Sequence, residues 1–423
     1  MIDHDVPPGH LTHCQICGSS DIELVLDCGL QPPCDSLLRA EDLNRPEKHY
    51  PLRLFRCTVC SNCQLDYIID GGEVYYPEYP YRSGITRELS EYQQSMASDL
   101  VPKIGLAPGS LVIDIGSNDG TLLSGFRKLA MRTLGIEPTN IGQIARDAGI
   151  ETLQSFFTEA VAQEVRRSYG GAKLITATNV FAHMATLGEV MRGILALLDD
   201  DGVFVFENHY LLDVIEKNQY DTIYHEHVRT YCLRPIIKLF SYYDMEVYRV
   251  ERVERYGGNI RVFTARRGRR PIEGSVGDLV RVEQEFGLYD RAVYSAFRER
   301  VEKTRDDLIA LTHKAKLEGA SFVGKACPGR CSTLLNYCDI GTYYLPYIAE
   351  QHTSLKLGMF LPGKHIPICK DERLIKDQPD FIVILAWHYG KPIGRILREK
   401  MGLKSKLVLP LPNVVVWEED IPS

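Results

Sequence analysis

Short apolar runs alternate with amphipathic stretches through the middle of the chain. Leu111–Ile115 is apolar except for Asp114, which is typical of a parallel strand buried on both faces. The expected strands are Leu111–Ile115, Thr133–Ile136, Leu174–Thr178, Gly202–Glu207, Glu246–Val253 and Asn259–Ala265. The expected helices are Arg87–Leu100, Thr121–Leu129, Asn140–Ala148 and Leu187–Leu198. This alternation predicts a doubly wound α/β sheet that ends in an antiparallel pair.

The same kind of pattern returns near the C-terminus. A charged region with helical periodicity, Gly277–Leu317, leads to a short apolar strand at Ser321–Gly324. Further strands are expected at Tyr343–Ile348 and Phe381–Ala386. The pattern therefore predicts a second, smaller α/β domain.

Seven of the twelve cysteines lie in the first eighty residues, which are rich in loops. Four of them form two Cys-x-x-C turns: Cys14, Cys17, Cys57 and Cys60. Two such turns can complete a tetrahedral zinc site, and a metal supplies folding free energy to a segment with little core. We expect a structural zinc; the alternatives are four free cysteines, or Cys63 in place of Cys60. Cys28 and Cys34 have no partner at ligand spacing and are expected to be packing residues.

Composition excludes several classes of protein. The chain has 423 residues, of which 44% are apolar and 25% charged, as in ordinary globular proteins of two or three domains. A net charge of −7 argues against a nucleic-acid-coating protein. No run approaches the ~18 apolar residues of a membrane span, and the N-terminus has no signal-peptide pattern. We expect a cytoplasmic protein with neither nucleic acid nor membrane as a partner.

The turn after Leu111–Ile115 has features of a nucleotide site. Gly116 and Gly120 bracket it, and glycine lets a ligand approach the backbone closely. Glu137 ends the next strand, seventeen residues past Gly120, where a carboxylate can accept the hydroxyls of a ribose. The pattern is neither Gly-x-Gly-x-x-Gly nor a P-loop, and it is typical of S-adenosylmethionine-dependent methyltransferases. The candidate cofactor residues are Asp114, Gly116, Asn118, Gly120, Glu137 and Asn179.

A second group of reactive residue types follows at Tyr224-His225-Glu226-His227. In an extended segment, Tyr224 and Glu226 would share one side and the two histidines the other. One histidine placed by hydrogen bonds could act as an acid or base near neutral pH. A metal would need further ligands, which nothing nearby supplies at regular spacing. Acid/base, metal and structural interpretations all stay open from this pattern alone.

Two further candidates lie outside these motifs. His183 follows the expected strand Leu174–Thr178 at its carboxyl end, where ligands bind in such folds, but it could also be a core or capping residue. The tyrosine-rich stretch 75–84, which includes Tyr81, contains two prolines and cannot be a regular helix. It is either a linker or a segment that folds over the active site and contributes a phenol.

Taken in order, the motifs resemble those of a known family. They are the two Cys-x-x-C turns, Ile113-Asp-Ile-Gly-Ser-Asn-Asp-Gly120, Tyr224-His-Glu-His227, Gly257-Gly-Asn-Ile-Arg261, Leu334-Leu-Asn-Tyr337 and Leu361-Pro-Gly-Lys-His-Ile-Pro-Ile368. This set resembles the bacterial deoxysugar C-methyltransferases, which methylate a carbon of a nucleotide-linked keto sugar with S-adenosylmethionine. The resemblance implies a zinc-binding domain at 10–82, a Rossmann-like methyltransferase domain at 83–268 and a C-terminal Rossmann-like domain at 272–423.

The resemblance also implies the roles of individual residues. It makes His227 the base, with Tyr224, Glu226, His183 and Tyr81 around the sugar. His227 would remove a proton next to a 4-keto group, Tyr224 or His183 would hydrogen-bond the enolate oxygen, and the carbon would attack the methyl group in line. The chain departs from the family at Gly324–Arg330, where Gly-Tyr-Gly-Ala is usual, and at Tyr256, where histidine is usual.

Two other functions are compatible with parts of the pattern. A zinc module and a methyltransferase domain also fit an RNA base methyltransferase, although residues 1–82 have no basic and aromatic stripe. A scaffold protein that retains only cofactor binding is the other alternative. The family resemblance favours the sugar C-methyltransferase, with a small-molecule nucleotide sugar as its substrate.

Overall fold

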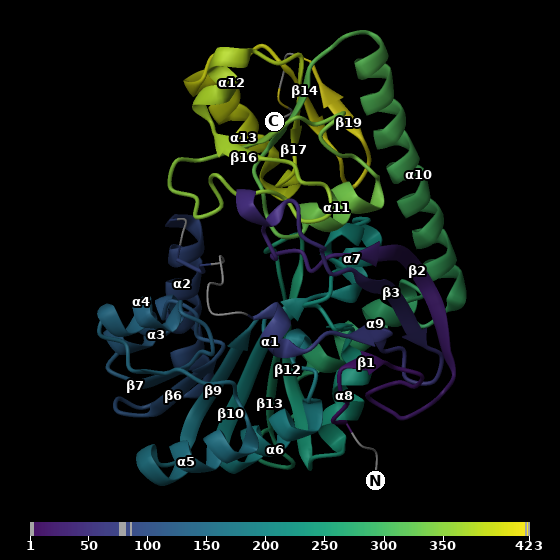
Figure 1. Cartoon of the computed structure of the whole chain (residues 1–423). Coiled ribbons are helices and arrows are strands. Elements are labelled where there is room, and N and C mark those ends of the chain that lie inside the picture. The colour runs from purple at the N-terminus through teal and green to yellow at the C-terminus, as the bar shows by residue number, and fades with distance from the viewer. Residues whose placement is uncertain (1–3, 76–81, 85–86, 419–420, 422–423) are drawn as a thin grey trace.

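The computed structural model describes residues 4–75, 82–84, 87–418 and 421. Tyr81, a predicted site residue, lies outside the described residues. Figure 1 shows a large sheet in the lower part of the molecule, small sheets of the N-terminal segment beside it, and a second α/β part above. The predicted class, an α/β protein with a methyltransferase-type sheet and a second α/β unit, is confirmed. The boundaries 10–82, 83–268 and 272–423 stay a prediction.

The large sheet has the order β12-β13-β10-β9-β6-β7-β8. Strands β10, β9, β6, β7 and β8 are parallel, whereas β13 pairs antiparallel with both β10 and β12. The predicted pair joined by a glycine turn is thus the antiparallel edge of the sheet. The strands are β6 (Leu111–Ile115), β7 (Arg132–Ile136), β8 (Thr152–Leu153), β9 (Ala172–Thr178), β10 (Leu198–His209), β12 (Met245–Val253) and β13 (Asn259–Arg266).

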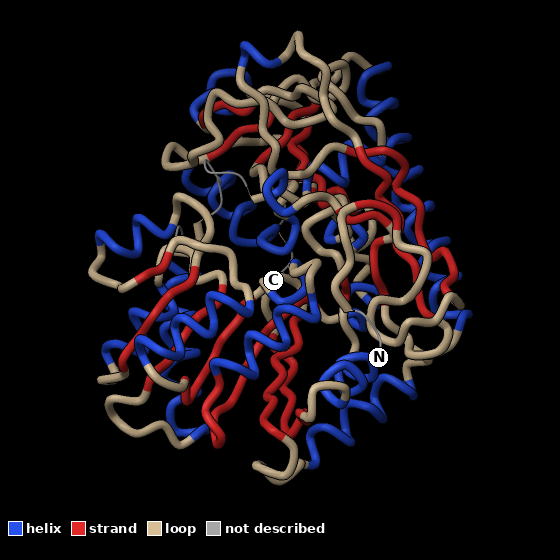
Figure 2. The backbone as a smooth tube through the Cα atoms, turned by 60° about the horizontal axis from the view of Figure 1, so that its bottom comes forward, coloured by secondary structure: helices blue, strands red, loops and turns tan. Residues whose placement is uncertain are grey.

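Helices cover both faces of this sheet (Figure 2). Side chains alternate along a strand, so Val112 of β6 packs in one buried cluster with α2 (Arg87–Ile104) and α3 (Thr121–Lys128). Ile113 points to the opposite face, into a cluster that includes residues of α5 (Glu159–Tyr169) and α6 (Leu187–Leu197). Burial on both faces explains why β6 is apolar almost throughout. The short helix α4 (Gly142–Asp147) contacts β8, and α8 (Leu233–Ser241) contacts β12.

The N-terminal segment forms an antiparallel sheet that a distant strand completes. Its order is β11-β4-β3-β2, made of β2 (Ile22–Gln31), β3 (Tyr50–Cys57), β4 (Cys63–Leu65) and β11 (Arg229–Thr230). Strands β1 (Gly9–His10) and β5 (Tyr67–Ile68) pair separately, and α1 (Gly71–Val74) follows. Because β11 comes directly after His227, its pairing with β4 brings the reactive segment against the N-terminal segment.

The C-terminal sheet has the order β16-β15-β14-β17-β18-β19, with only β18 and β19 antiparallel among the described residues. The charged region that leads to it divides into α9 (Gly274–Glu285) and α10 (Arg291–Leu317), and α10 runs up one side of the molecule (Figure 1). Gly287, with φ of +77°, lies in the break between them. The strands are β14 (Phe322–Lys325), β15 (Ile348–Glu350), β16 (Ile368–Lys370), β17 (Phe381–Ile384), β18 (Lys406–Leu409) and β19 (Val415–Trp417), and the helices are α11 (Cys331–Tyr337), α12 (Glu372–Asp377) and α13 (Gly390–Arg395).

The strand expected at Tyr343–Ile348 is wrong. The backbone turns there, with the N–H groups of Tyr344 and Leu345 both donating to the Gly341 carbonyl. Pro346 has no N–H to donate to a ladder, so pairing begins only at Ile348. The tyrosines gave this segment a strand-like composition although its hydrogen bonds are those of a turn. No helix in the described part of the chain is long and apolar enough to cross a membrane.

Candidate active site

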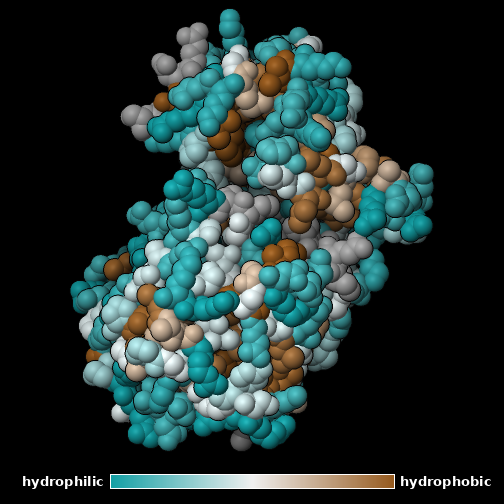
Figure 3. Space-filling model, turned by 90° about the vertical axis from the view of Figure 1, so that its left-hand side faces the viewer, coloured by the Kyte–Doolittle hydropathy of each residue, from teal (hydrophilic) through white to brown (hydrophobic). Residues whose placement is uncertain are grey.

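A cavity of about 540 Å³ lies where the three parts of the chain meet. Figure 3 shows an indentation on this side of the molecule between the C-terminal part and the rest. The N-terminal segment contributes Ile69, Val74 and Tyr75, the large sheet contributes Gly116, Glu137 and Asn179, and the C-terminal part contributes Arg330 and His388. The same cavity is lined by Tyr224, His225, Glu226 and His227. The two motif groups of the sequence therefore face one shared space.

The end of the cavity near β6 fits an adenosine cofactor. Gly116 lines the cavity with φ of +68°, and a Cβ there would collide with Val180, so only glycine, whose backbone is bare, fits at this point. Glu137 follows β7 and lines the cavity with 5% of its surface exposed. Its carboxylate accepts the N–H of Asn118 at 2.9 Å and the hydroxyl of Thr139 at 2.7 Å. A held carboxylate beside bare backbone is what binding of a ribose and its neighbours requires.

Two predicted cofactor residues, Asp114 and Gly120, do not line the cavity. The Asp114 carboxylate accepts the hydroxyl of Thr176 at 2.6 Å, and burial raises its pKa to about 7. Gly120 has φ of +74° at the start of α3, where a Cβ would press on Ala145 and Ile150. Both support the turn that Asn118 belongs to, while Asn118 and Asn179 themselves line the cavity.

The reactive segment is a turn rather than an extended strand. It follows a 3₁₀ helix, η3 (Tyr220–Thr222), and the N–H of His227 donates to the carbonyl of Tyr224 at 2.9 Å. The expected alternation of sides is therefore wrong, and Tyr224, His225, Glu226 and His227 all reach the cavity. The turn forms because β11 must pair with β4 immediately after it.

His227 is held in one tautomer. Its Nδ1 lies 2.7 Å from the Thr222 carbonyl oxygen, and a carbonyl can only accept, so Nδ1 carries the proton. Nε2 is then the atom with a free lone pair. Burial lowers the pKa of His227 to about 3, with the Thr222 carbonyl opposing this shift and Arg330 adding to it. The imidazole is therefore neutral near pH 7, with its lone pair on Nε2.

His225 is held differently. Its Nε2 donates to the Pro51 carbonyl of the N-terminal segment at 3.3 Å, and its ring meets Tyr50 edge-on. Its Nδ1 is buried and has no hydrogen-bond partner among the described residues. Burial lowers the pKa of His225 to about 4, and the Pro51 carbonyl opposes the shift. His225 thus packs the reactive turn onto β3.

Aromatic and imidazole rings cluster around His227 in the cavity. The His227 ring centre lies 4.0 Å from that of Tyr224, 4.6 Å from His209 and 5.0 Å from His183. Tyr75 stacks on His183 at 6.0 Å. Burial lowers the pKa values of His183 and His209 well below their ordinary range, and His227 adds to the effect. His183 is therefore a cavity residue, and His209, at the end of β10, is one that the sequence patterns did not single out.

Glu226 is bordered by residues of the N-terminal segment. The Cys34 thiol donates to Glu226 Oε1 at 3.5 Å, so the buried Cys34 contacts a predicted site residue. The neighbouring Asp35 lines the cavity and pairs with Lys356 Nζ at 3.0 Å. Cys34, Asp35 and Glu226 lie close enough to share a metal ion, but the ammonium of Lys356 already provides the positive charge at this point.

The segment Gly324–Arg330, which departs from the family pattern, reaches the cavity with its last three residues, Pro328, Gly329 and Arg330. Arg330 donates to Asp221 at 2.8 Å and reaches His388 at 3.3 Å, and Trp387 Nε1 donates to the same carboxylate at 2.8 Å. Arg330 thereby joins the C-terminal part to η3, next to the reactive turn. Tyr256, the second departure, lines the cavity with φ of +50° and lies 6.2 Å from His209 between ring centres.

The four Cys-x-x-C sulfurs form a compact cluster away from this cavity. All four lie within 4.8 Å of one another, and Sγ of Cys14 and Cys60 are 3.5 Å apart, as are those of Cys17 and Cys57. Asn62 Nδ2 points to the Cys14 sulfur at 3.8 Å. Cys63 is not in the cluster; its thiol lies 3.9 Å from the Tyr294 hydroxyl. The donor set and its closure fit a tetrahedral structural zinc.

Comparisons with known proteins agree with this arrangement. Family models match as a zinc binding domain over residues 14–75, a methyltransferase domain over 89–250 and a C-methyltransferase C-terminal domain over 254–412. The C-methyltransferase NovU of Streptomyces niveus is 30% identical over 405 residues, which is 95% of this chain and 96% of that protein. Sphingolipid C9-methyltransferase A of Emericella nidulans is 30% identical over 161 residues, or 33% of this chain and 30% of that protein.

Solved structures with a similar fold cover less of the chain. An S-adenosylmethionine-dependent methyltransferase from Clostridium acetobutylicum has a TM-score of 0.34 and 12% identity, over 42% of this chain and 92% of its own. Magnesium protoporphyrin IX methyltransferase from Synechocystis has a TM-score of 0.31 and 14% identity, over 42% of this chain and 79% of its own.

Proposed function

Because the chain belongs to the family of S-adenosylmethionine-dependent C-methyltransferases with an N-terminal zinc-binding domain, we propose that it methylates a carbon of a nucleotide-linked 4-keto deoxysugar. The observation that supports this reaction most directly is the tautomer of His227. Its Nδ1–H donates to Thr222, which leaves Nε2 as a proton acceptor in a cavity shared with Gly116 and Glu137. A base and a cofactor site facing one space are what carbon methylation needs.

His227 acts as the base in this proposal. A carbon next to a carbonyl is acidic because its carbanion delocalises into an enolate, and Nε2 takes that proton. The rings of Tyr224 and His183 both lie close to that of His227, and one of these two residues donates to the enolate oxygen, where one preorganised donor contributes about 3 kcal/mol. Glu226 and Tyr81 complete the sugar site. When bound, S-adenosylmethionine supplies a methyl group already activated on a sulfonium.

Other residues hold the cofactor and the metal. Glu137 accepts the ribose hydroxyls, Gly116 leaves the backbone accessible, and Asn118 and Asn179 contribute polar contacts from the same wall. Asp114 and Gly120 support the turn from behind. Cys14, Cys17, Cys57 and Cys60 bind the structural zinc. That zinc stabilises the N-terminal segment, whose β4 pairs with the strand after His227.

The test is methyl transfer to a panel of substrates. The purified protein is incubated with methyl-labelled S-adenosylmethionine and nucleotide-linked sugars that differ only at position 4, as 4-keto and 4-hydroxy pairs. Label in a carbon-bound methyl of a 4-keto sugar, and none in its 4-hydroxy partner, is the expected result. In a parallel incubation with RNA, label in the RNA and binding that weakens steeply with salt would instead support the base methyltransferase. No transfer to any member, despite cofactor binding, would support the scaffold alternative.

A further inference from the structure

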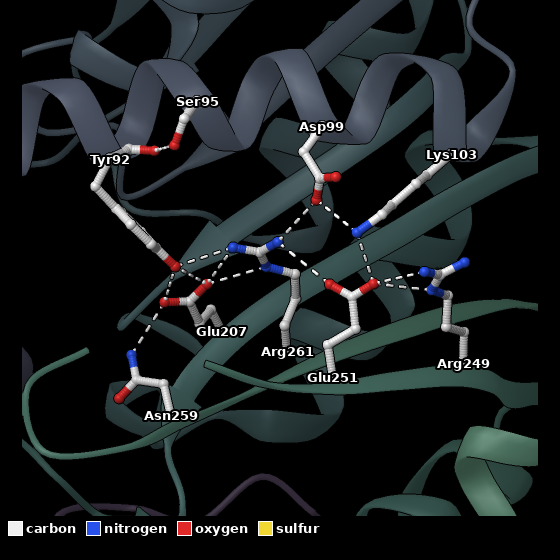
Figure 4. Close-up of polar contacts among 9 residues, drawn as sticks. All are labelled: Tyr92, Ser95, Asp99, Lys103, Glu207, Arg249, Glu251, Asn259 and Arg261. Carbon is white, nitrogen blue, oxygen red and sulfur yellow. Dashed lines mark hydrogen bonds and ion pairs between the residues drawn. The ribbon is translucent and has the colours of Figure 1, made fainter. Parts of the chain in front are cut away.

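A buried polar network joins residues of α2, β10 and β13 (Figure 4). At its centre is Glu207, which is fully buried. Its carboxylate accepts the Tyr92 hydroxyl at 2.7 Å and pairs with Arg261 at 3.0 Å. The register of β10 and β13 sets Glu207 directly opposite Arg261, so this ion pair is a cross-strand pair inside the sheet.

Asn259 extends the network toward the cavity. Its Nδ2 donates to Glu207 Oε1 at 3.1 Å and to Asn179 Oδ1 at 3.2 Å. A carboxylate beside arginine only accepts, so the Asn259 amide must present Nδ2 to it. The same Nδ2 also faces Asn179, which must therefore present its oxygen. The Glu207 carboxylate thus determines the orientation of the Asn259 amide, which in turn determines that of the Asn179 amide.

Asn179 is the member of this chain of contacts that reaches the cavity. It follows β9, lines the cavity with Gly116 and Glu137, and has φ of +55°. Its own N–H donates to the Glu207 carbonyl, so backbone and side chain are both held by β10 and β13. Because Oδ1 is engaged by Asn259, the Nδ2 donors of Asn179 are directed away from the network.

We propose that Glu207, Arg261 and Asn259 are positioning residues that orient the Asn179 amide so that its N–H groups donate to an acceptor of the bound cofactor. The inference rests on the proposed function, which places the cofactor at Gly116, Glu137 and Asn179. It gives a role to the Gly257-Gly-Asn-Ile-Arg261 motif, whose contribution to the reaction was otherwise unassigned. Asn259 and Arg261 are two apart on β13, and both reach the same carboxylate.

The glycines of the motif set the start of β13. Gly257 and Gly258 have φ of +90° and +132°, which other residues rarely adopt. A Cβ on Gly258 would also collide with Asp213. The tight turn lets β13 begin at Asn259, so that this residue pairs with His209 and its side chain lies beside Glu207.

The far end of the network offers a matched control. Lys103 and Arg249 both pair with Glu251, at 2.8 and 2.7 Å, and these side chains are partly exposed (Figure 4). Arg249 belongs to the same network and carries the same charge as Arg261. It contacts neither Asn259 nor Asn179 in the described structure. A substitution at either end of the network would loosen its packing. Only a substitution at the buried end would disturb the orientation of the Asn179 amide.

The experiment is a double-mutant cycle on cofactor binding. Affinity for S-adenosylhomocysteine is measured by calorimetry on the full chain, with a thermal unfolding curve for each variant. Asn179→Ala and Asn259→Ala are each expected to weaken binding about tenfold, and the double variant no further, because Asn259 acts through Asn179. Arg249→Ala is expected to bind like the wild type.

Two results would overturn the proposal: additive losses in the double variant, or unchanged affinity of Asn259→Ala with only a lowered melting temperature. If Asn259→Ala does not fold, Tyr92→Phe removes a single donor to Glu207, and its loss must likewise vanish in the Asn179→Ala background. No sugar substrate enters this assay, so failure of the sugar proposal leaves it standing. Unchanged affinity of Asn179→Ala would overturn both the inference and the cofactor placement.

Discussion

Nδ1 of His227 lies 2.7 Å from the carbonyl oxygen of Thr222, five residues earlier in the same turn. This single contact assigns the proton to Nδ1 and the lone pair to Nε2, without any partner from another part of the chain. His225, two residues away, is in the other tautomer, because its Nε2 carries the proton and donates to the Pro51 carbonyl. The two neighbouring histidines therefore differ in which nitrogen can act as a base.

The first prediction separates these histidines. Asparagine at 227 can keep a donor for the Thr222 carbonyl while lacking a nitrogen in place of Nε2. His227→Asn is therefore expected to fold and bind cofactor but to lose turnover by at least about a hundredfold. It should also stop exchange of the substrate C–H with deuterated solvent, followed by mass spectrometry.

His225→Asn is the control for that experiment. It is expected to retain solvent exchange, with an effect on stability because it removes the contact to β3. Exchange at the wild-type rate in His227→Asn, combined with its loss in His225→Asn, would identify His225 as the base instead.

The second prediction concerns the ribose. Glu137→Ala removes the acceptor of two hydroxyls and also the partner of the Asn118 N–H, so S-adenosylmethionine binding should weaken by roughly 1–3 kcal/mol. Isothermal calorimetry measures this directly. Glu189→Gln, which changes another carboxylate of the cavity wall, is the matched control and should leave affinity unchanged. Equal affinities for Glu137→Ala and the wild type would remove Glu137 from the cofactor site.

The third prediction concerns the metal. We expect one zinc per chain by elemental analysis, lost in Cys57→Ser together with a lower melting temperature, because one thiolate of the tetrahedron is missing. Cys63→Ser changes a neighbouring buried cysteine outside the cluster and should keep the zinc. Retention of stoichiometric zinc by Cys57→Ser, or its loss in Cys63→Ser, would show that the ligand set is different.

The fourth prediction is a loss of stability in acid. Burial lowers the pKa of His227 to about 3 and of His225 to about 4, whereas unfolded histidine titrates near 6.5. Below pH 6.5 the unfolded chain therefore binds more protons, and the free energy of unfolding falls as pH falls, by up to about 1.4 kcal/mol per pH unit for each such group. His183 and His209 act in the same direction.

Urea unfolding between pH 7.5 and 4.5 measures this slope. Loss of zinc in acid would act on all variants alike, so the comparison is between slopes. His227→Asn should reduce the slope by about one proton, while His49→Asn, at an exposed position, should not. Identical slopes for His227→Asn and the wild type would mean that His227 is not buried in its neutral form.

The local patterns of the sequence determined six of the seven strands of the large sheet, the glycine turn and the cysteine pairs, whereas the two-residue strand β8 was not predicted. Leu111–Ile115 is a strand as expected, because burial on both faces requires a nearly continuous apolar run. The Cys-x-x-C turns likewise each bring two sulfurs together within four residues, whatever the rest of the fold does. Features of this kind depend on residues close in sequence, so periodicity and spacing reveal them.

The surroundings of the reactive residues were decided only by the tertiary structure. Cys34 meets Glu226 across 192 positions of sequence, and Arg330 meets Asp221 across 109. The pairing of β11 with β4 turns the His227 segment so that all four of its predicted residues reach one cavity, where an extended strand would have divided them. His209 and Glu207 carry no motif of their own. They acquire their neighbours because segments far apart in the sequence pack together at this sheet: the antiparallel strand β13 and helix α2 reach Glu207, and the turn before β11 reaches His209.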